Sequence, residues 1–403
     1  MANSTYALDG LVVADFTSHI AGPYATKLLA DLGARVIKVE RPGGDPARRL
    51  GPFLGDEPGI ERSGTYQFLN TNKESVVLDL KSAQGREAAH RFASAADLVV
   101  TGCPPAVAAR LGLDYESLAR RTKAPVVAIT NFGSAGPYRD YALSDTVLFA
   151  MGGEMFSHGT VDREPLKLGG TGALLQCGAM AGIAALGAIH AYELHGVGQL
   201  VDVPLFDVQI NSVDRRSSTI LAYRFSGRVQ ERPPGAGAGI AGGIYECADG
   251  FVEVTASSGN YWNRFVDMID DPALRDPRFA EPAFLVSPEA KEIVDGVVYP
   301  WMFSHTRLEV WAAARRAHAV VAPLFTGKDV YEDAVFRERG LWTEVEHATL
   351  GSFPMLGRPY VLEKTPWAIR RHAPILGEHT EAVLAEVGFS PDERAAIRQE
   401  VPA

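Results

Sequence analysis

Short apolar runs alternate with longer stretches of helical periodicity in the first third of the chain. Continuous β-branched runs predict strands at residues 11–16, 36–40, 75–80, 98–100 and 126–129. Helical patterns lie between them, for example at residues 23–32 and 83–95. This alternation is typical of a parallel sheet covered on both faces, in which ligands bind beyond the carboxyl ends of the strands.

The hydrophobic pattern changes further along the chain. It predicts a helix over residues 174–195, a strand at 199–204 and a helix over 206–223, followed by a linker rich in Gly, Pro and Arg at 224–243. We therefore expect residues 1–224 to form the first part of a large α/β domain and residues 225–330 to form a smaller α+β domain. Residues 331–403 are expected to return to the large domain.

Composition narrows the possible partners and the compartment. A chain of 403 residues, 46% of them hydrophobic, can bury a large core, and its net charge of −10 disfavours nucleic-acid or anionic-membrane binding. Three isolated cysteines, Cys103, Cys177 and Cys247, predict a reducing cytoplasm and no metal site. The most apolar window, residues 174–189, is short for a membrane span and is expected to be a buried helix.

Several short motifs occur in a fixed order along nearly the whole chain. They lie at residues 21–23, 29–34, 36–40, 43–45, 72–73, 111–113, 136–138, 198–203 and 373–380. This ordered set resembles family III CoA-transferases, the superfamily of formyl-CoA transferase, carnitine CoA-transferase and 2-methylacyl-CoA racemase. The resemblance implies a doubly wound, mainly parallel large domain built from both chain ends, a smaller α+β domain and an interlocked dimer.

The same resemblance places a nucleophilic aspartate four residues before Gly178, and that position holds Leu174. In the family mechanism the aspartate attacks the donor thioester and forms a mixed anhydride, which a hydrocarbon side chain cannot do. Cys177 offers a thiol nearby, although buried structural cysteines are more common than catalytic ones. His19 and His158 are candidate bases because imidazole titrates near neutrality, although structural histidines are again the commoner case.

Coenzyme A, as the substrate thioester, is the cofactor that the resemblance implies, with no metal. The resemblance places Arg41 near the adenosine part of CoA and Lys73 and Arg110 near its phosphates. It also places Asn72 and Asn131 among the residues that bind CoA. The stretch 101–105 lacks a cation that relatives often carry there. The string Gly237-x-Gly239-x-x-Gly242 does not follow a predicted strand, so we do not expect it to bind a dinucleotide; the resemblance implies a loop over the active site instead.

Four functions therefore remain open from the sequence. The chain is an active CoA-transferase with a substitute nucleophile, the non-catalytic subunit of a heteromeric transferase, an acyl-CoA α-carbon racemase or isomerase, or a CoA-thioester-binding protein without catalysis. The expected partners are acyl-CoA and carboxylate small molecules, together with a second copy of the chain or an Asp-bearing homologous subunit. We expect neither a nucleic acid nor a membrane as partner, and a cytoplasmic location. The apolar character of Leu174 favours the non-catalytic subunit.

Overall fold

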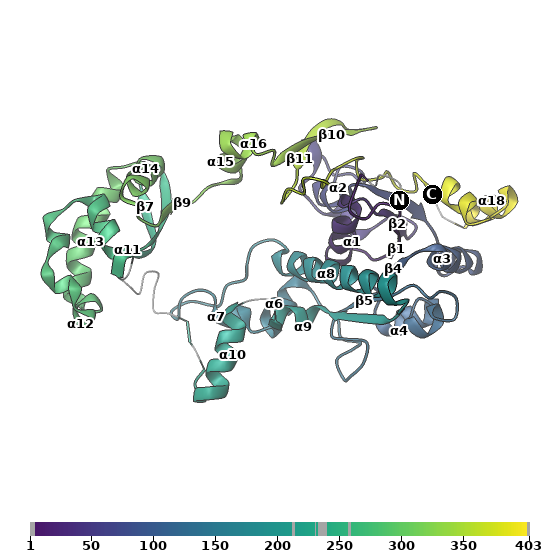
Figure 1. Ribbon diagram of the computed structural model, residues 1–403, viewed down its shortest axis with the longest axis horizontal. Coiled ribbons are helices and arrows are strands. Elements are labelled where there is room, and N and C mark those ends of the chain that lie inside the picture. Colours follow the sequence, from purple (N-terminus) through teal and green to yellow (C-terminus); the bar gives the residue numbers. More distant parts are fainter. Residues whose placement is uncertain (1–4, 212–213, 230, 233–239, 257–258, 401–403) are drawn as a thin grey trace. The chain divides into compact units, whose positions relative to one another are not determined.

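The computed structural model describes residues 5–211, 214–229, 231–232, 240–256 and 259–400 (Figure 1). The chain forms two compact units. Unit 1 contains residues 1–155, 167–229 and 337–403, and unit 2 contains residues 156–166 and 230–336. Both chain ends contribute to unit 1, whereas residues 156–166, which lie inside the predicted range 1–224 of the large domain, pack with unit 2.

Unit 1 is built on a six-stranded parallel sheet with the order β3-β2-β1-β4-β5-β6. Its strands are β1 (Val12–Phe16), β2 (Arg35–Glu40), β3 (Lys73–Val77), β4 (Leu98–Thr101), β5 (Val126–Thr130) and β6 (Leu200–Pro204). The chain winds outward from β1 in one direction and from β4 in the other, which confirms the predicted α/β class. The crevice that such a reversal creates lies beyond the carboxyl ends of β1 and β4.

Alternate residues of the strands contact helices on opposite faces of the sheet. Val13 of β1 packs in the core formed with α1 (Ala21–Asp31) and α8 (Gly172–His195), whereas Ala14 packs in the core formed with α3 (Ala83–Ala95). The other helices of this part of unit 1 are α2 (Gly64–Asn70), α4 (Pro105–Leu111), α5 (Tyr115–Leu118), α6 (Asp145–Met151), α9 (Leu205–Asn211), α10 (Asp214–Ser226) and the 3-10 turns η1 (Pro46–Arg49) and η2 (Leu54–Asp56). Helix α7 (Glu154–Ser157) crosses the boundary between the two units at residue 156.

Helix α8 is long and apolar enough, by length and composition, to cross a membrane. Half of its most apolar window is nevertheless buried inside the protein, as in the core helix that the sequence predicts. It packs closely against α1 because Gly178 and Gly182 carry no side chain: a Cβ at Gly178 would lie 2.5 Å from the carbonyl oxygen of Ala21.

The C-terminal part of unit 1 covers the edge strand β3. It contains the antiparallel hairpin β10 (Trp342–His347) and β11 (Gly351–Leu356), then α17 (Thr380–Glu386) and α18 (Pro391–Gln399). The His379 N–H donates to the Ser75 carbonyl at 3.0 Å, and the Val77 N–H donates to Thr380 Oγ1 at 3.1 Å. These bonds satisfy groups that an open sheet edge would leave free to pair with other chains.

Unit 2 has its own antiparallel sheet, β7 (Gly242–Cys247), β8 (Gly250–Thr255) and β9 (Val321–Pro323), which confirms the predicted hairpin around residues 248–250. Its helices are α11 (Gly259–Ile269), α12 (Pro282–Leu285), α13 (Pro288–Phe303), α14 (Arg307–Ala317) and α15 (Gly327–Glu332), with 3-10 turns η3 (Pro272–Arg275) and η4 (Pro277–Ala280). Helix α16 (Ala334–Glu338) crosses the boundary to unit 1 after residue 336. Val252, Phe265 and Val298 are fully buried in the core between the helices and the sheet.

Candidate functional site

A pocket of about 170 Å³ lies beyond the carboxyl ends of β1, β4 and β5; we call it the strand-end pocket. The loop after each strand contributes to it, which is where ligands bind in open α/β sheets. Its lining consists of Thr17, Ser18, His19, Ile20, Ala21, Gly22, Gly102, Ile129, Asn131, Leu143, Ser144, Leu174 and Leu205. Three residues singled out in the sequence, His19, Asn131 and Leu174, are thereby brought together.

Leu174 lies in the first turn of α8 and forms part of the pocket wall, with 5% of its surface exposed. Its backbone N–H donates to Asp145 Oδ1 at 3.3 Å, and Asp145 Oδ2 lies 2.6 Å from Lys167 Nζ. Among the described residues that line the pocket, the polar side chains are hydroxyls, one imidazole and one amide, and none is a carboxylate, a thiol or an amine.

His19 contributes the imidazole of this lining. Its backbone adopts a φ of 71°, a left-handed conformation that costs free energy in a residue other than glycine. The His19 N–H donates to Asp45 Oδ1 at 3.0 Å, and this bond helps to hold the conformation. On the other side of the pocket, Asn131 Nδ2 donates to the Tyr141 carbonyl at 3.0 Å.

Buried charges of alternating sign support the loop that forms the pocket floor. Asp15 accepts hydrogen bonds from the Thr17 N–H, the Thr17 hydroxyl and the Thr26 hydroxyl. Lys38 Nζ donates to the Thr17 carbonyl at 3.0 Å and pairs with Asp45 Oδ2 at 2.7 Å. Burial would raise the pKa of Asp15, but Lys73, Lys38 and the threonine bonds hold it below its usual value, so Asp15 remains charged.

The predicted contact of Lys73 with CoA phosphates is not compatible with its surroundings. Its side chain is fully buried, and Nζ donates to the Pro23 carbonyl, the Thr26 hydroxyl and Asn70 Oδ1 at 2.8 to 3.0 Å. Asp15 lies 3.3 Å away. Burial lowers the pKa of Lys73 to about 7, against the attraction of Asp15. Lys73 is therefore a structural residue beneath the pocket.

Asn72 is also structural, in contrast to its predicted role in CoA binding. Its side chain is buried and its φ is 67°. Nδ2 donates to Asp31 Oδ1 and to the Ala368 carbonyl, while Oδ1 accepts from the N–H groups of Arg370 and Arg371. All these partners are internal, so the side chain ties the C-terminal segment to α1.

Arg41 lines an open pocket, as its predicted role in CoA binding requires. A pocket of about 590 Å³, here the Arg41 pocket, is lined by Arg41, Pro42, Gly43, Pro46, Arg49, Asp79 and Lys81. Its three cations outnumber its one carboxylate, which suits a ligand with several phosphate charges. Sequence reasoning missed Arg49 and Lys81, although the glycine pair after β2 indicated a turn there. Arg110, in the last turn of α4, is exposed and is not part of the lining of either pocket.

The other candidate catalytic residues, Cys177 and His158, are not among the lining residues of the strand-end pocket. Cys177 is fully buried in the core under α8, with Sγ 3.5 Å from the Leu205 carbonyl, so the structural role is the one observed. His158 belongs to the segment of unit 2 at residues 156–166. Gly237 and Gly239 of the glycine-rich string lie outside the described residues, and Gly242 begins strand β7 rather than a helix. Over the part of the chain that the structure describes, no cluster of three or more metal-ligating side chains occurs.

The fold and the strand-end pocket define a doubly wound α/β protein with a ligand crevice at its topological switch point. Residues 8–380 match CoA-transferase family III, and the chain belongs to this family. This confirms the relationship that the ordered motifs indicate.

Two curated relatives illustrate the similarity. Subunit BbsE of succinyl-CoA:(R)-benzylsuccinate CoA-transferase from Thauera aromatica is 31% identical over 94% of this chain and 93% of its own length. Formyl-CoA:oxalate CoA-transferase from Bradyrhizobium sp. is 31% identical over 98% of this chain and 96% of its own length. Among solved structures, a CAIB/BAIF family protein from Brucella suis matches with a TM-score of 0.84 at 28% identity, over 95% of this chain and all of that one.

Proposed function

We propose that this chain is the subunit of a heteromeric family III CoA-transferase that does not supply the attacking carboxylate. The complex moves CoA from an acyl-CoA thioester to a carboxylic acid, and a homologous partner subunit carries the aspartate. The observation that carries the proposal is the lining of the strand-end pocket. Leu174 stands at the position that the resemblance gives to the nucleophile. Among the described residues that line the pocket, none carries a carboxylate or a thiol that could replace it.

The chemistry of the lining separates this proposal from the alternatives. Covalent transfer requires a group that accepts the acyl unit, and hydrocarbon at residue 174 does not. A racemase requires two groups that exchange protons on opposite sides of the α-carbon, whereas His19 is the one imidazole of the described lining and no acid accompanies it. The geometry therefore favours a chain that retains a thioester pocket without the reacting group.

The similarity to BbsE supports the heteromeric form. That relative is named as the subunit of a CoA-transferase, and it aligns with this chain over nearly the full length of both proteins. In a pair of homologous subunits, one chain would carry the catalytic aspartate and the other would contribute the fold and the CoA pocket without it.

The Arg41 pocket is the part of this chain that we assign to the phosphates of CoA. Arg41 Nε donates to the Gly44 carbonyl at 3.2 Å, and Arg49 Nη2 donates to the Gly43 carbonyl at 2.9 Å, so the turn after β2 holds both guanidinium groups. Contacts between such cations and phosphate oxygens each stabilise a complex by about 1.5–3 kcal/mol. Arg41→Gln and Lys81→Gln should therefore each weaken CoA binding about tenfold in calorimetry.

The test is to purify the chain alone and together with a homologous subunit that carries aspartate at the matching position. Succinyl-CoA and formyl-CoA serve as donors and a panel of dicarboxylic acids as acceptors, with acyl-CoA products separated by chromatography. We expect transfer only with the partner, and we expect Leu174→Ala in this chain to leave that transfer largely intact. Transfer by the chain alone would overturn the proposal.

Leu174→Asp tests whether the rest of the pocket is competent for chemistry. If the loss of the carboxylate is the main defect, this variant gains transfer on its own, and the isosteric Leu174→Asn variant does not. Equal activity of the two variants would show that a carboxylate at residue 174 is not what the pocket lacks.

A further inference from the structure

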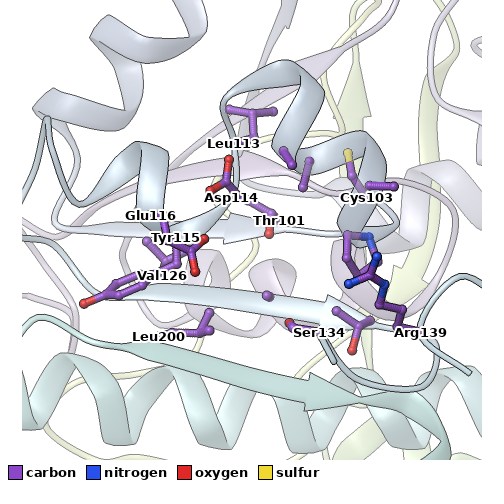
Figure 2. A pocket seen from close by; sticks show the side chains of 16 residues that line it. Thr101, Cys103, Leu113, Asp114, Tyr115, Glu116, Val126, Ser134, Arg139 and Leu200 are labelled. Carbon is purple, nitrogen blue, oxygen red and sulfur yellow. The ribbon is translucent and has the colours of Figure 1, made fainter. Parts of the chain in front are cut away.

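A third cavity, separate from the strand-end and Arg41 pockets, lies on the other face of β5 from the strand-end pocket. It has a volume of about 300 Å³, and Figure 2 shows it between α4, the loop before α5 and the sheet. Val126 and Ala128 form part of its floor, whereas Val127 and Ile129 point to the opposite face, toward α8. Because side chains alternate along a strand, this cavity and the strand-end pocket use different faces of β5.

The two ends of this cavity carry opposite charges. Figure 2 shows Arg139 and Ser134 at one end, and Asp114, Tyr115 and Glu116 at the other. We call it the Arg139 cavity. Val126, Ala128 and Leu200 contribute hydrocarbon to its lining.

The cationic end has donors available for a ligand. Arg139 Nε pairs with Asp140 Oδ2 at 3.1 Å, and both side chains are about half exposed. Within the described residues, the two terminal nitrogens of this guanidinium have no protein acceptor. A guanidinium in this state can donate two parallel bonds to one carboxylate.

The anionic end is held in its charged form. Asp114 caps helix α5, with Oδ1 accepting from the Ser117 N–H at 3.1 Å. Burial would raise the pKa of Asp114, but hydrogen bonds from the hydroxyl and the N–H of Ser117 hold it below its usual value. Two neighbouring carboxyl groups at one end attract a cation and repel phosphates or a second carboxylate.

We propose that the Arg139 cavity is a binding site for a small zwitterion with an aliphatic middle, such as an ω-amino acid. Its carboxylate would pair with Arg139, its ammonium group would lie against Asp114 and Glu116, and its methylene groups would cover the apolar floor. Small-molecule sites have this composition, mainly hydrocarbon with a few placed polar groups. The proposed ligand is not a thioester, and the site shares no described lining residue with the strand-end or Arg41 pocket. Thr101, Cys103 and Pro105 of its lining belong to the stretch 101–105, which lacks the cation that relatives often carry there.

Calorimetry on the full-length protein tests the proposal without any thioester. The probes are 4-aminobutanoate and 6-aminohexanoate, compared with butanoate, hexanoate and hexylamine, each of which lacks one of the two charges. We expect at least one zwitterion to bind about tenfold or more tightly than its singly charged counterparts. Equal binding of all the probes, or no binding of either zwitterion at ~10 mM, the weak end of the affinity scale, would overturn the proposal.

Variants then locate the binding. Arg139→Gln and Glu116→Gln should each weaken binding of the preferred zwitterion about tenfold, and Ala109→Phe should abolish it by filling the cavity. Arg120→Gln is the matched control, because Arg120 is an exposed arginine of the same region that does not line the cavity. Thermal unfolding of each variant confirms that it is folded. Full binding by Arg139→Gln, or an equal loss in Arg120→Gln, would contradict the assignment.

Discussion

The carboxylate of Asp145 accepts a hydrogen bond from the Leu174 backbone N–H at 3.3 Å, while its other oxygen lies 2.6 Å from Lys167 Nζ. Asp145 is the first residue of α6, so this carboxylate ties the start of α8 to a second helix beside the strand-end pocket. A negative charge near the first turn of α8 also interacts favourably with the helix dipole. Asp145 therefore holds the part of the pocket wall that contains Leu174, although Asp145 is not itself a lining residue.

Asp145→Ala should lower the free energy of unfolding by about 1–3 kcal/mol, because it removes the acceptor of the Leu174 N–H and the carboxylate that pairs with Lys167, which keeps its bonds to the Leu168 and Gly170 carbonyls. Asp145→Asn keeps an oxygen acceptor and loses only the charge, so its loss should be smaller. Urea denaturation monitored by circular dichroism measures both. If Asp145→Ala matched the wild type, the contact would not hold the start of α8.

The buried pair of Asp15 and Lys73 should be strongly coupled. Lys73→Met removes the cation in direct contact with Asp15 and leaves Lys38 as the remaining buried cation nearby, so it should destabilise the protein by about 3 kcal/mol, the low end for a broken buried pair. Asp15→Asn combined with Lys73→Met removes both charges and should recover part of that loss. A double-mutant cycle by urea denaturation gives the coupling free energy, and simple additivity of the two changes would rule out a direct interaction.

The pair of Asp15 and Lys73 also shows why the sequence predicted the position of the pocket better than the residues that contact the CoA phosphates. The strands followed from β-branched runs, whereas His19, Asn131 and Leu174 were singled out separately, and the structure places all three in the lining of the strand-end pocket. Asp15 and Lys73 are 58 residues apart, however, and nothing in the local pattern shows that they meet. Strand β3 begins at Lys73 and Glu74, charged residues that the hydrophobic pattern placed before the predicted strand at residues 75–80.

The second unit was harder to delimit for a related reason. Composition marked residues 224–243 as a linker, and the observed boundary at residues 229 and 230 falls inside that stretch. Residues 156–166 carry no such marker. Arg232 donates to the carbonyls of Phe156, Thr160 and Arg163, and this long-range set of bonds places the segment in unit 2.

Glu40 should make the protein sensitive to acid. Burial would raise the pKa of Glu40, but its bonds and attraction to Arg48, with help from Lys38 and Ser75, lower it from 4.5 to about 2. The unfolded state then binds more protons than the folded state between these values. The stabilisation is therefore present above pH 4.5 and is lost as the pH falls toward 2.

The shift in the pKa of Glu40 corresponds to about 3 kcal/mol at neutral pH. Urea titrations at pH 6, 4 and 3 should show the wild type losing more stability on acidification than Glu40→Gln, which cannot titrate. The variant is also expected to be less stable at pH 6, because Arg48 loses an ionic partner. Parallel pH dependence in the two proteins would mean that Glu40 is not the responsible group.

The close contact between α1 and α8 can be tested with two glycines of the same helix. A Cβ at Gly178 would meet the Ala21 carbonyl oxygen at 2.5 Å, and this backbone atom cannot move aside as a flexible side chain would. Gly187 is exposed, and a Cβ there would meet no atom within 4 Å. Gly178→Ala should therefore destabilise the protein by about 1–3 kcal/mol, whereas Gly187→Ala should stabilise it by about 0.5–1 kcal/mol.

The same contact sets the shape of the strand-end pocket, since α1 contributes Ala21 and Gly22 to its lining and α8 contributes Leu174. A Gly178→Ala variant that forces the two helices apart should therefore also change ligand binding in that pocket, while Gly187→Ala should not. Acyl-CoA titrations of both variants, alongside their unfolding curves, distinguish a local effect on the pocket from a general loss of stability. Equal stability of the two variants would contradict the close packing on which the position of Leu174 depends.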